Sequence, residues 1–329
     1  MESHSRRGEK PAMNAEIAKK RLTEFVWYHI NGDGDCNGQT LKAYAGMKHL
    51  QAQDMFDLAY FYATTYCCAS AVYLLKNREQ IRHNPSEFAI THKDSIIFQS
   101  DRKYVRMRDT FCKMLNDWAL NLQDAQRQFD ADTGARTGTI NTNDALAAVE
   151  KWYFFKRFSA YLFVETYCDI IGLRATRATG LKYEGDNMTF AGGACYVYAK
   201  DDEARYVQRD HKLPFSIERF EMMIRGIQQQ VRANGGDDSL VKLETSLCAY
   251  EKFFKGTRYN GYYADRMLGE ITELQNRSRE MRGICADIMV ARRTAIKPQY
   301  LGELHGWNGV RKELKKSYQR TGTIAGCPV

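Results

Sequence analysis

The stretch LAYFYATTYCCASAVYLL, residues 58–75, contains eighteen consecutive residues without a charged side chain. A membrane-spanning helix needs about 20 apolar residues, so this length is the minimum for a span. Four tyrosines, two threonines and a serine make the stretch polar for lipid, no second such stretch occurs, and the mean hydropathy of the chain is −0.55. We therefore expect a helix that is buried on all sides in a large helical domain, with no membrane contact.

The segments around this stretch have apolar residues spaced three or four positions apart, as in amphipathic helices. There is no alternation of strands with helices and no internal repeat, so the sequence predicts an all-α fold in one large domain over 14–329. Capping residues and glycines delimit the expected helices. They cover 54–77, 100–118, 144–172, 216–227, 239–254 and the basic C-terminal part.

Three regions lack the helical pattern. Residues 1–13 are charged and are expected to form a flexible N-terminal arm, and 129–144 are rich in Gly, Thr, Asp and Asn, which predicts a loop. The stretch 174–215 contains four glycines and predicts an irregular insert. Within it, the alternating run ACYVYA (194–199) suggests a small hairpin.

The composition excludes several classes of protein. With 44% hydrophobic residues and only 5 Pro, the chain is neither disordered nor collagen-like, and its net charge of +8 excludes an acidic tail protein. The nine cysteines are odd in number, scattered and without a CxxC pair, which excludes a secreted disulfide framework or a zinc ribbon. We expect a protein of the reducing cytoplasm.

Nearly all of the excess positive charge lies between residues 276 and 320, a segment that contains eleven Lys and Arg and only four acidic residues. If these side chains share one face, they attract a polyanion such as DNA. An ordinary solvated helical surface is the alternative. The predicted DNA-binding residues are Arg292, Arg293, Arg311, Lys312, Lys315 and Lys316.

Common catalytic and metal-binding motifs are absent from the sequence, which has no Walker A motif, no GxGxxG before a helix and no HExxH. The run DGDCNG (33–38) resembles the start of an EF-hand loop, but its twelfth position is Tyr44 instead of a bidentate glutamate. We therefore interpret it as a turn that caps a helix, and we predict no metal site.

Two clusters of polar residues among aromatics are candidates for chemistry. In KFFKGTRYNGYYADRMLGE (252–270), Lys252, Arg258 and Arg266 are suited to phosphate oxygens, and Asp265 to orienting an arginine or accepting a proton. A helix–turn–helix corner with Asp265 and Arg266 as a surface ion pair is the alternative.

The second cluster is WYFFKRFSAYLFVETYCDIIGL (152–173), in which charged residues interrupt an apolar helix. Glu165 and Asp169 are four positions apart and share one helix face, as do Arg157 and Tyr161. Charges on such a helix are paired, functional or exposed at its edge, and the sequence leaves these alternatives open.

Two segments follow one another along the chain: KRFSAYLFVETYCDIIGL (156–173) is followed by LETSLCAYEKFFKGTRYNGYYADRMLGEI (243–271). In these segments and in their order, the chain resembles an all-helical superfamily that bacteriophages use to hypermodify thymine. These are the α-glutamyl/putrescinyl thymine pyrophosphorylases. The superfamily includes 5-hydroxymethyluracil DNA kinases and amino acid:DNA transferases. The run from Leu247 to Arg266 is more similar to the transferases, and the resemblance spans roughly 95–275.

The resemblance implies an enzyme that displaces pyrophosphate from pyrophosphorylated 5-hydroxymethyluracil in double-stranded DNA and joins a free amino acid, glycine or another small one, to the base. It implies Asp265, Arg266 and Glu165 as catalytic residues. Mg²⁺ is a candidate cofactor that would assist the departure of pyrophosphate in this reaction, and no acidic pair in the sequence identifies a site for it. The substrate-binding residues that the resemblance implies are Lys252, Arg258, Tyr259, Tyr262, Tyr161 and Arg157.

Two alternatives to the transferase stay open at the level of sequence. One is a 5-hydroxymethyluracil DNA kinase of the same superfamily, and the other is a helical DNA-binding protein without enzymatic activity. For a protein encoded by a phage, each of these functions belongs to the host cytoplasm.

The basic C-terminal segment generates the first testable prediction, which concerns Lys312, Lys315 and Lys316. Changing all three to Glu should weaken DNA binding and flatten the dependence of affinity on salt, because fewer counterions are released from the phosphates. Titrations of labelled duplex DNA at several salt concentrations measure both quantities. Unchanged affinity and slope would remove this segment from the DNA interface.

Overall fold

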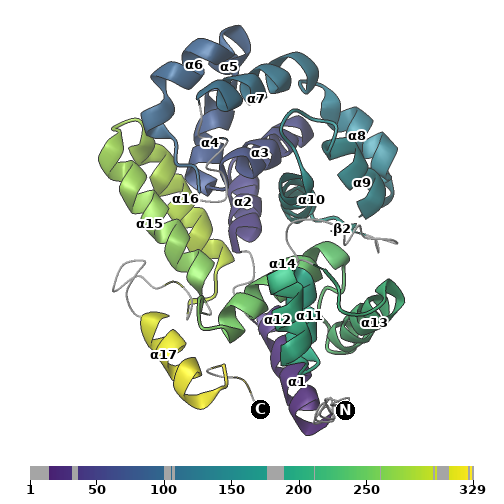
Figure 1. The fold of residues 1–329 in the computed structure, drawn as a ribbon. Helices are drawn as coiled ribbons and strands as arrows, with labels where there is room; N and C mark the ends of the chain where they lie inside the picture. The colour runs from purple at the N-terminus through teal and green to yellow at the C-terminus, as the bar shows by residue number, and fades with distance from the viewer. Residues whose placement is uncertain are drawn as a thin grey trace, which may run out of the picture.

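The computed structural model confirms the all-α fold (Figure 1). It describes residues 15–31, 36–99, 105, 108–175, 189–210, 212–259, 261–298, 301, 311–324 and 327. Within these ranges, the only strands are β1 (Thr139–Ile140) and β2 (Arg174–Ala175), which pair in parallel. Residues 1–13, predicted as a flexible arm, lie outside the described ranges.

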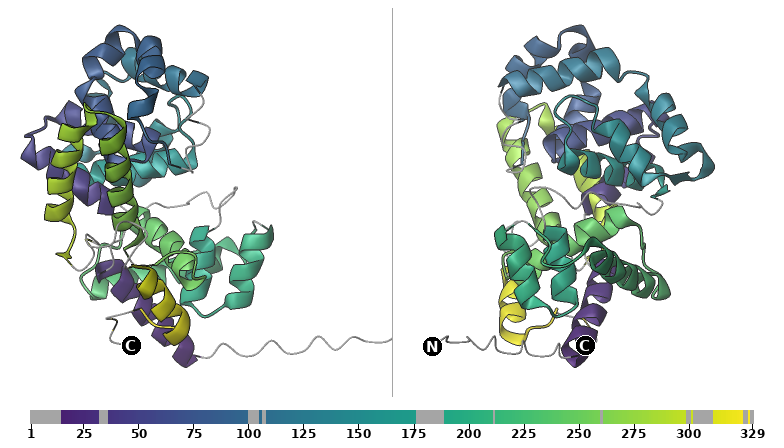
Figure 2. Two further views of the ribbon diagram at one scale, coloured as in Figure 1. Left: turned by 90° about the vertical axis from the view of Figure 1, so that its left-hand side faces the viewer. Right: turned by 45° about the vertical axis from the view of Figure 1, so that its right-hand side comes forward.

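The helices gather in two groups, which are distinct in Figure 1 and in the side view of Figure 2. The upper group contains α2 (Cys36–Met47), α3 (Ala52–Thr65), α4 (Cys68–Lys76), α5 (Arg78–His83), α6 (Pro85–Thr91), η1 (Lys93–Ser95), α7 (Arg108–Asn121), α8 (Ala125–Thr133), η3 (Ala135–Thr137), α9 (Thr142–Val149), α10 (Arg157–Ile171), α15 (Tyr262–Arg277) and α16 (Met281–Ala295). The lower group contains α1 (Ala15–Asn31), α11 (Thr189–Val197), α12 (Asp201–Asp210), α13 (Ile217–Ala233), α14 (Leu240–Phe254) and α17 (Arg311–Thr321).

The uncharged stretch 58–75 lies in the centre of the upper group, and each of its residues is buried, as predicted. It forms two helices instead of one, because α3 ends at Tyr66, which has a φ of 58°. Cys67 is extended, and α4 begins after it. Among the described residues, no helix is long and apolar enough to cross a membrane.

The helix predicted over 144–172 is also divided in two. Asn141 caps α9 by accepting the N–H groups of Asn143 and Asp144, and residues 150–156 form turns before α10 begins. The predicted loop 129–144 is therefore shorter, because α8 continues to Thr133 and α9 starts at Thr142. The start predicted for the helix over 100–118 lies outside the described residues, and α7 ends at Asn121.

The insert predicted over 174–215 is largely helical where the structure describes it, and the predicted hairpin at 194–199 is wrong. Residues 194–197 belong to α11, which packs along α14. A Cβ at Gly193 would overlap the carbonyl oxygen of Leu247, so glycine permits this close approach. Residues 176–188 lie outside the described part of the chain.

Aromatic rings from distant segments hold the upper group together. Phe56 of α3 lies 5.1 to 5.8 Å, between ring centroids, from four rings on α8, α10 and the turn before α10. All four contacts are edge-to-face, a favourable geometry for aromatic pairs. The four partners are Phe129, Trp152, Phe163 and Tyr167. This cluster fixes one side of α10.

One buried carboxyl group lies in the same core. Asp57 of α3 has no exposed surface, and its carboxylate accepts hydrogen bonds from Trp118 Nε1 at 3.0 Å and from Gln53 Nε2 at 2.8 Å. Burial raises the pKa of Asp57 to about 6, even though both hydrogen bonds favour the charged form. The folded protein therefore binds a proton here at a pH where the unfolded chain has lost it.

This pKa gives a prediction for stability against pH. Because the folded protein holds the proton more tightly, Asp57 should make unfolding progressively easier as the pH rises from about 4 to about 6. Asp57→Asn, whose amide oxygen can accept from Trp118, should raise the free energy of unfolding at pH 7 by up to about 3 kcal/mol.

Chemical denaturation of the wild type and Asp57→Asn at pH 4, 5, 6 and 7 measures the effect. The two curves should converge towards pH 4. A variant that is less stable at every pH would contradict the raised pKa.

Candidate functional site

The predicted residues of 252–270 lie at the turn that joins α14 to α15. The carbonyl oxygen of Lys252 accepts the N–H groups of Thr257 and Arg258, at 2.9 and 3.1 Å. Gly256 has a φ of 67°, in the left-handed region that favours glycine at the end of a helix. These contacts fix the point at which Arg258 leaves the backbone, before α15 begins at Tyr262.

Two arginines of this segment pack against tyrosine rings. The guanidinium carbon of Arg258 lies 4.7 Å from the ring centroid of Tyr262, and that of Arg266 lies 4.3 Å from the centroid of Tyr66. Both arginines are also 5.0 Å from the ring of Tyr263, so they share one aromatic partner. Burial opposes the charge of Arg266, but Tyr66 and Glu270 raise its pKa well above the ordinary value.

Arg266 is buried, with 7% of its surface exposed, and its donors are only partly used. Its Nε lies 3.1 Å from Oε1 of Glu270, which also accepts a hydrogen bond from Gln99. Its Nη2 has no hydrogen-bond partner in the part of the chain that the structure describes. An unsatisfied buried donor costs about 1–3 kcal/mol. The rings of Tyr66 and Tyr263 lie against this guanidinium in place of further acceptors.

Arg266 lies on the wall of a cavity of about 710 Å³. One face of α15 forms a wall, and α6, η1, the segment 96–99 and Phe111 of α7 form the rest. The charged residues of this wall are Lys93, Asp94, Arg266, Glu270, Glu273 and Arg277. The cavity is large enough for a ligand with several anionic oxygens or a small organic group.

Asp265 is buried, with 1% of its surface exposed, and does not line this cavity. Its Oδ2 accepts a hydrogen bond from the hydroxyl of Tyr259 at 3.1 Å. The alternative of Asp265 and Arg266 as a surface ion pair is wrong, because both are buried and Arg266 pairs with Glu270. Asp265 therefore holds Tyr259 in place.

The second predicted cluster lies where α10 meets α14 and α2. Lys242 Nζ is 3.3 Å from Glu165 Oε1 and 2.6 Å from Asp169 Oδ2. Thr245 donates to Glu165 at 2.8 Å, and Gln39 donates to Asp169 at 3.0 Å. Glu165 and Asp169 are 3% and 8% exposed, so the alternative of carboxylates at an exposed helix edge is wrong.

One face of α10 connects the two clusters. Residues 158, 161, 165 and 169 follow one another at helical spacing. At the N-terminal end of this face, the ring of Phe158 lies 5.8 Å from that of Tyr66, which packs against Arg266. Tyr161 is buried on the same face, between Phe158 and Glu165. The side chain of Arg157 lies outside the described part of the structure.

The predicted DNA-binding residues have different surroundings. Arg292 is fully buried and donates to the carbonyl oxygens of Ala264, at 3.3 Å, and Leu301, so its prediction as a DNA contact is wrong. Arg293 and Lys316 are exposed. The side chains of Arg311, Lys312 and Lys315 lie outside the described part of α17.

Sequence reasoning missed Tyr66, Gln99 and Lys242. Tyr66 and Gln99 come from segments distant from α15 in the sequence, and no local pattern relates them to Arg266. For Lys242 a signal was present, because two carboxylates on an otherwise apolar helix require a cation nearby. The sequence does not indicate which lysine supplies it.

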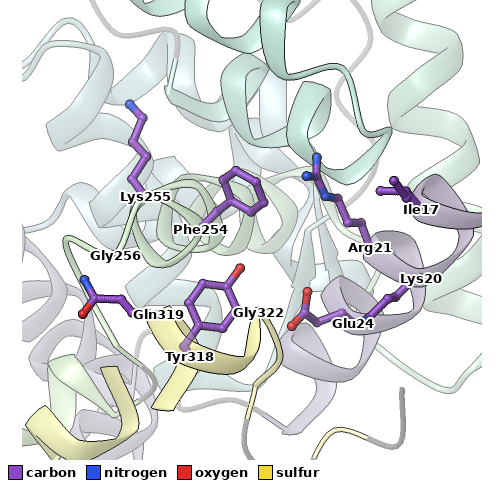
Figure 3. Close-up of a pocket in the computed structure, with 10 residues that line it drawn as sticks. All are labelled: Ile17, Lys20, Arg21, Glu24, Phe254, Lys255, Gly256, Tyr318, Gln319 and Gly322. Atoms are coloured by element: carbon purple, nitrogen blue, oxygen red, sulfur yellow. The ribbon is translucent and has the colours of Figure 1, made fainter. Parts of the chain in front are cut away.

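A second cavity, of about 500 Å³, lies between α1, the end of α14 and α17 (Figure 3). Glu24 at its edge accepts hydrogen bonds from Tyr250 and from the backbone N–H of Ile324. Arg21 packs over the ring of Phe254 and pairs with Asp201. These contacts join the N-terminal and C-terminal segments, and no predicted catalytic residue lines this cavity.

Comparisons with known proteins give no family: no family model matches the chain, and no curated protein is similar to it. Within the described ranges, no three His, Cys, Asp or Glu side chains come together at a point that could hold a metal ion.

Lys242 gives a prediction for stability. Lys242→Met should lower the free energy of unfolding by about 3 kcal/mol, because it leaves Glu165 and Asp169 buried without their cation.

The matched control is Arg225→Met, which removes an exposed arginine paired with Glu221 on α13. It should cost less than about 1 kcal/mol. Urea denaturation of the wild type and both variants at pH 7 makes the comparison. Equal losses would contradict a buried, charge-coupled cluster.

Proposed function

We propose that the protein is an amino acid:DNA transferase that displaces pyrophosphate from pyrophosphorylated 5-hydroxymethyluracil in DNA. The observation that carries this proposal is the buried guanidinium of Arg266, which lies on the wall of the 710 Å³ cavity and whose Nη2 has no hydrogen-bond partner among the described residues. Such a group is suited to an anionic leaving group. The resemblance of 156–173 and 243–271 to the thymine-hypermodification superfamily supports the choice of substrate.

The reaction needs one bond to form and one to break. The amine nitrogen of a free amino acid bonds to the exocyclic carbon of the base, the bond from that carbon to the pyrophosphate oxygen breaks, and the nitrogen loses a proton. Negative charge develops on the departing oxygen, where a fixed cation lowers the energy of the transition state most. Arg266 has this role in the proposal.

Other residues bind the substrates. Arg258 supplies a second cation beside Arg266, and Lys252, at the end of α14, is assigned with it to the carboxylate of the amino acid. Tyr161, Tyr259 and Tyr262 position the base, together with Arg157.

Glu165 is assigned as the proton acceptor, with Lys242 Nζ 3.3 Å from its Oε1. Asp265 acts through its hydrogen bond with Tyr259, so it is a positioning residue in this proposal.

The partners follow from the reaction. Double-stranded DNA with the modified thymine is one substrate, and a small amino acid such as glycine is the other. The exposed Arg293 and Lys316, with Arg311, Lys312 and Lys315 of the same basic segment, supply the DNA surface in this proposal. We place the activity in the cytoplasm of the cell that holds the DNA, without assigning Mg²⁺ a site.

Arg266 provides the decisive test. Arg266→Ala should lower the rate of pyrophosphate release by roughly two to three orders of magnitude and change DNA affinity little, because the charge acts mainly in the transition state. Arg266→Lys keeps the charge beside Glu270 but loses the planar fork, so its rate should be intermediate. Mass spectrometry of nucleosides from pyrophosphorylated DNA incubated with mixed amino acids identifies the product.

Asp265→Asn, which keeps the shape and removes the charge, should lower turnover by weakening the contact with Tyr259. Arg225→Ala, on an exposed face of α13, is the control and should keep the wild-type rate. Circular dichroism confirms the fold of each variant. Folded and fully active Arg266 variants would overturn the assignment. If the wild type has no measurable turnover and the variants lose DNA affinity, the result favours a DNA-binding protein without enzymatic activity.

A further inference from the structure

The turns between α9 and α10 expose large aromatic rings. Tyr153, Phe154 and Phe158 are 38%, 39% and 43% exposed, whereas Phe155 in the same segment is buried against Tyr60. The rings of Tyr153 and Phe154 lie beside each other, with 6.2 Å between their centroids. Phe158 follows in the first turn of α10, so three exposed rings fall within six residues, and we refer to these three together as the patch. Water solvates such rings poorly.

Phe154 also has an unusual backbone. Its φ is 64°, in the left-handed region, which is a genuine outlier for a bulky residue. The turns are held by the N–H of Tyr153, which donates to Asp117 Oδ2 at 3.0 Å, and by the N–H of Phe155, which donates to the carbonyl of Trp152 at 3.1 Å. Glycine would adopt this conformation at lower cost. The fold therefore does not need a phenylalanine ring at this position.

The patch has a cationic border. Lys151 and Lys156 flank it, both are exposed, and neither forms an ion pair with a residue that the structure describes. The segment 150–158 contains three basic residues and one acidic residue, Glu150. Aromatic rings that alternate with free cations are typical of surfaces that bind single-stranded nucleic acid, because bases stack on the rings and phosphates lie beside the lysines.

The patch continues into the candidate site. Phe158 contacts Tyr66 edge-to-face, and Tyr66 packs against the guanidinium of Arg266. Tyr66 is itself left-handed, with a φ of 58°, and buried. A base held on Phe158 would therefore lie one aromatic ring away from the cation assigned to the leaving group.

We propose that Tyr153, Phe154 and Phe158 form a stacking platform that receives a nucleobase extruded from DNA, with Lys151 and Lys156 holding the adjacent phosphates. The inference rests on the proposed function insofar as DNA is the substrate. An enzyme that modifies a base must take it out of the duplex, and a base out of the stack needs a new aromatic surface.

The test measures stacking without the transfer reaction. It uses a single-stranded oligonucleotide of unmodified DNA that carries one 2-aminopurine, whose fluorescence falls when it stacks. Phe154→Gly and Phe158→Ala should each weaken binding by about tenfold and relieve the quenching, with an unchanged dependence on salt. Phe154→Gly should keep or raise the melting temperature, which separates a lost ligand contact from a damaged fold.

The paired charge variant Lys151→Gln/Lys156→Gln should have the opposite pattern. It should reduce the salt slope of the affinity by about 1.4 and keep the quenching. Met222→Ala, which removes an exposed apolar side chain from α13, is the control and should behave as the wild type.

Two negative results are distinguishable. If the wild type quenches the oligonucleotide and the two phenylalanine variants do so equally, the platform is wrong while DNA stays the substrate. If the wild type binds neither the oligonucleotide nor duplex DNA, both the platform and the proposed function fail.

Discussion

The contact of Lys242 with two buried carboxylates of α10 is the constraint on which the arrangement of the two helix groups depends. Glu165 and Asp169 are one helical turn apart and almost completely buried, so both can be ionised only with a cation beside them. That cation comes from α14, in the other group. A Cβ at Gly38 of α2 would overlap the Asp169 carboxylate, so the third helix of this junction is also tightly placed.

The opposite side of α10 has a different chemistry. Its rings Phe163 and Tyr167 pack with Phe56 of α3, so the helix can neither rotate nor slide without losing aromatic contacts or exposing its carboxylates. With α10 fixed, Phe158 at its start meets Tyr66, and Tyr66 meets Arg266 of α15. Residues more than a hundred positions apart in the sequence are thus joined by a chain of ring and cation contacts through the position of a single helix.

The sequence predicts those features of the fold that depend on the helical spacing of apolar residues. Apolar residues at helical spacing indicate the all-α fold and the burial of 58–75, but a segment that is apolar on all sides contains no signal for a break such as the one at Tyr66. Buried helices with small residues are equally ambiguous, which explains the hairpin expected at 194–199. Arg292 shows that a basic run in the sequence does not indicate which of its charges are buried. It belongs to the basic segment 276–320, and in the fold it donates to two backbone carbonyls.

Two departures from the ordinary rules of folding concern residues of α15 and of the turns before α10. Arg266 keeps a buried donor without an acceptor in the described chain, and Phe154 keeps an exposed ring on a left-handed backbone. Each lowers stability, and a different residue would remove the cost in each case. Phe158, four residues after Phe154, contacts Tyr66, which packs against Arg266. Features that cost stability are expected at sites shaped by binding, because a ligand can accept from a buried donor and can cover an exposed ring.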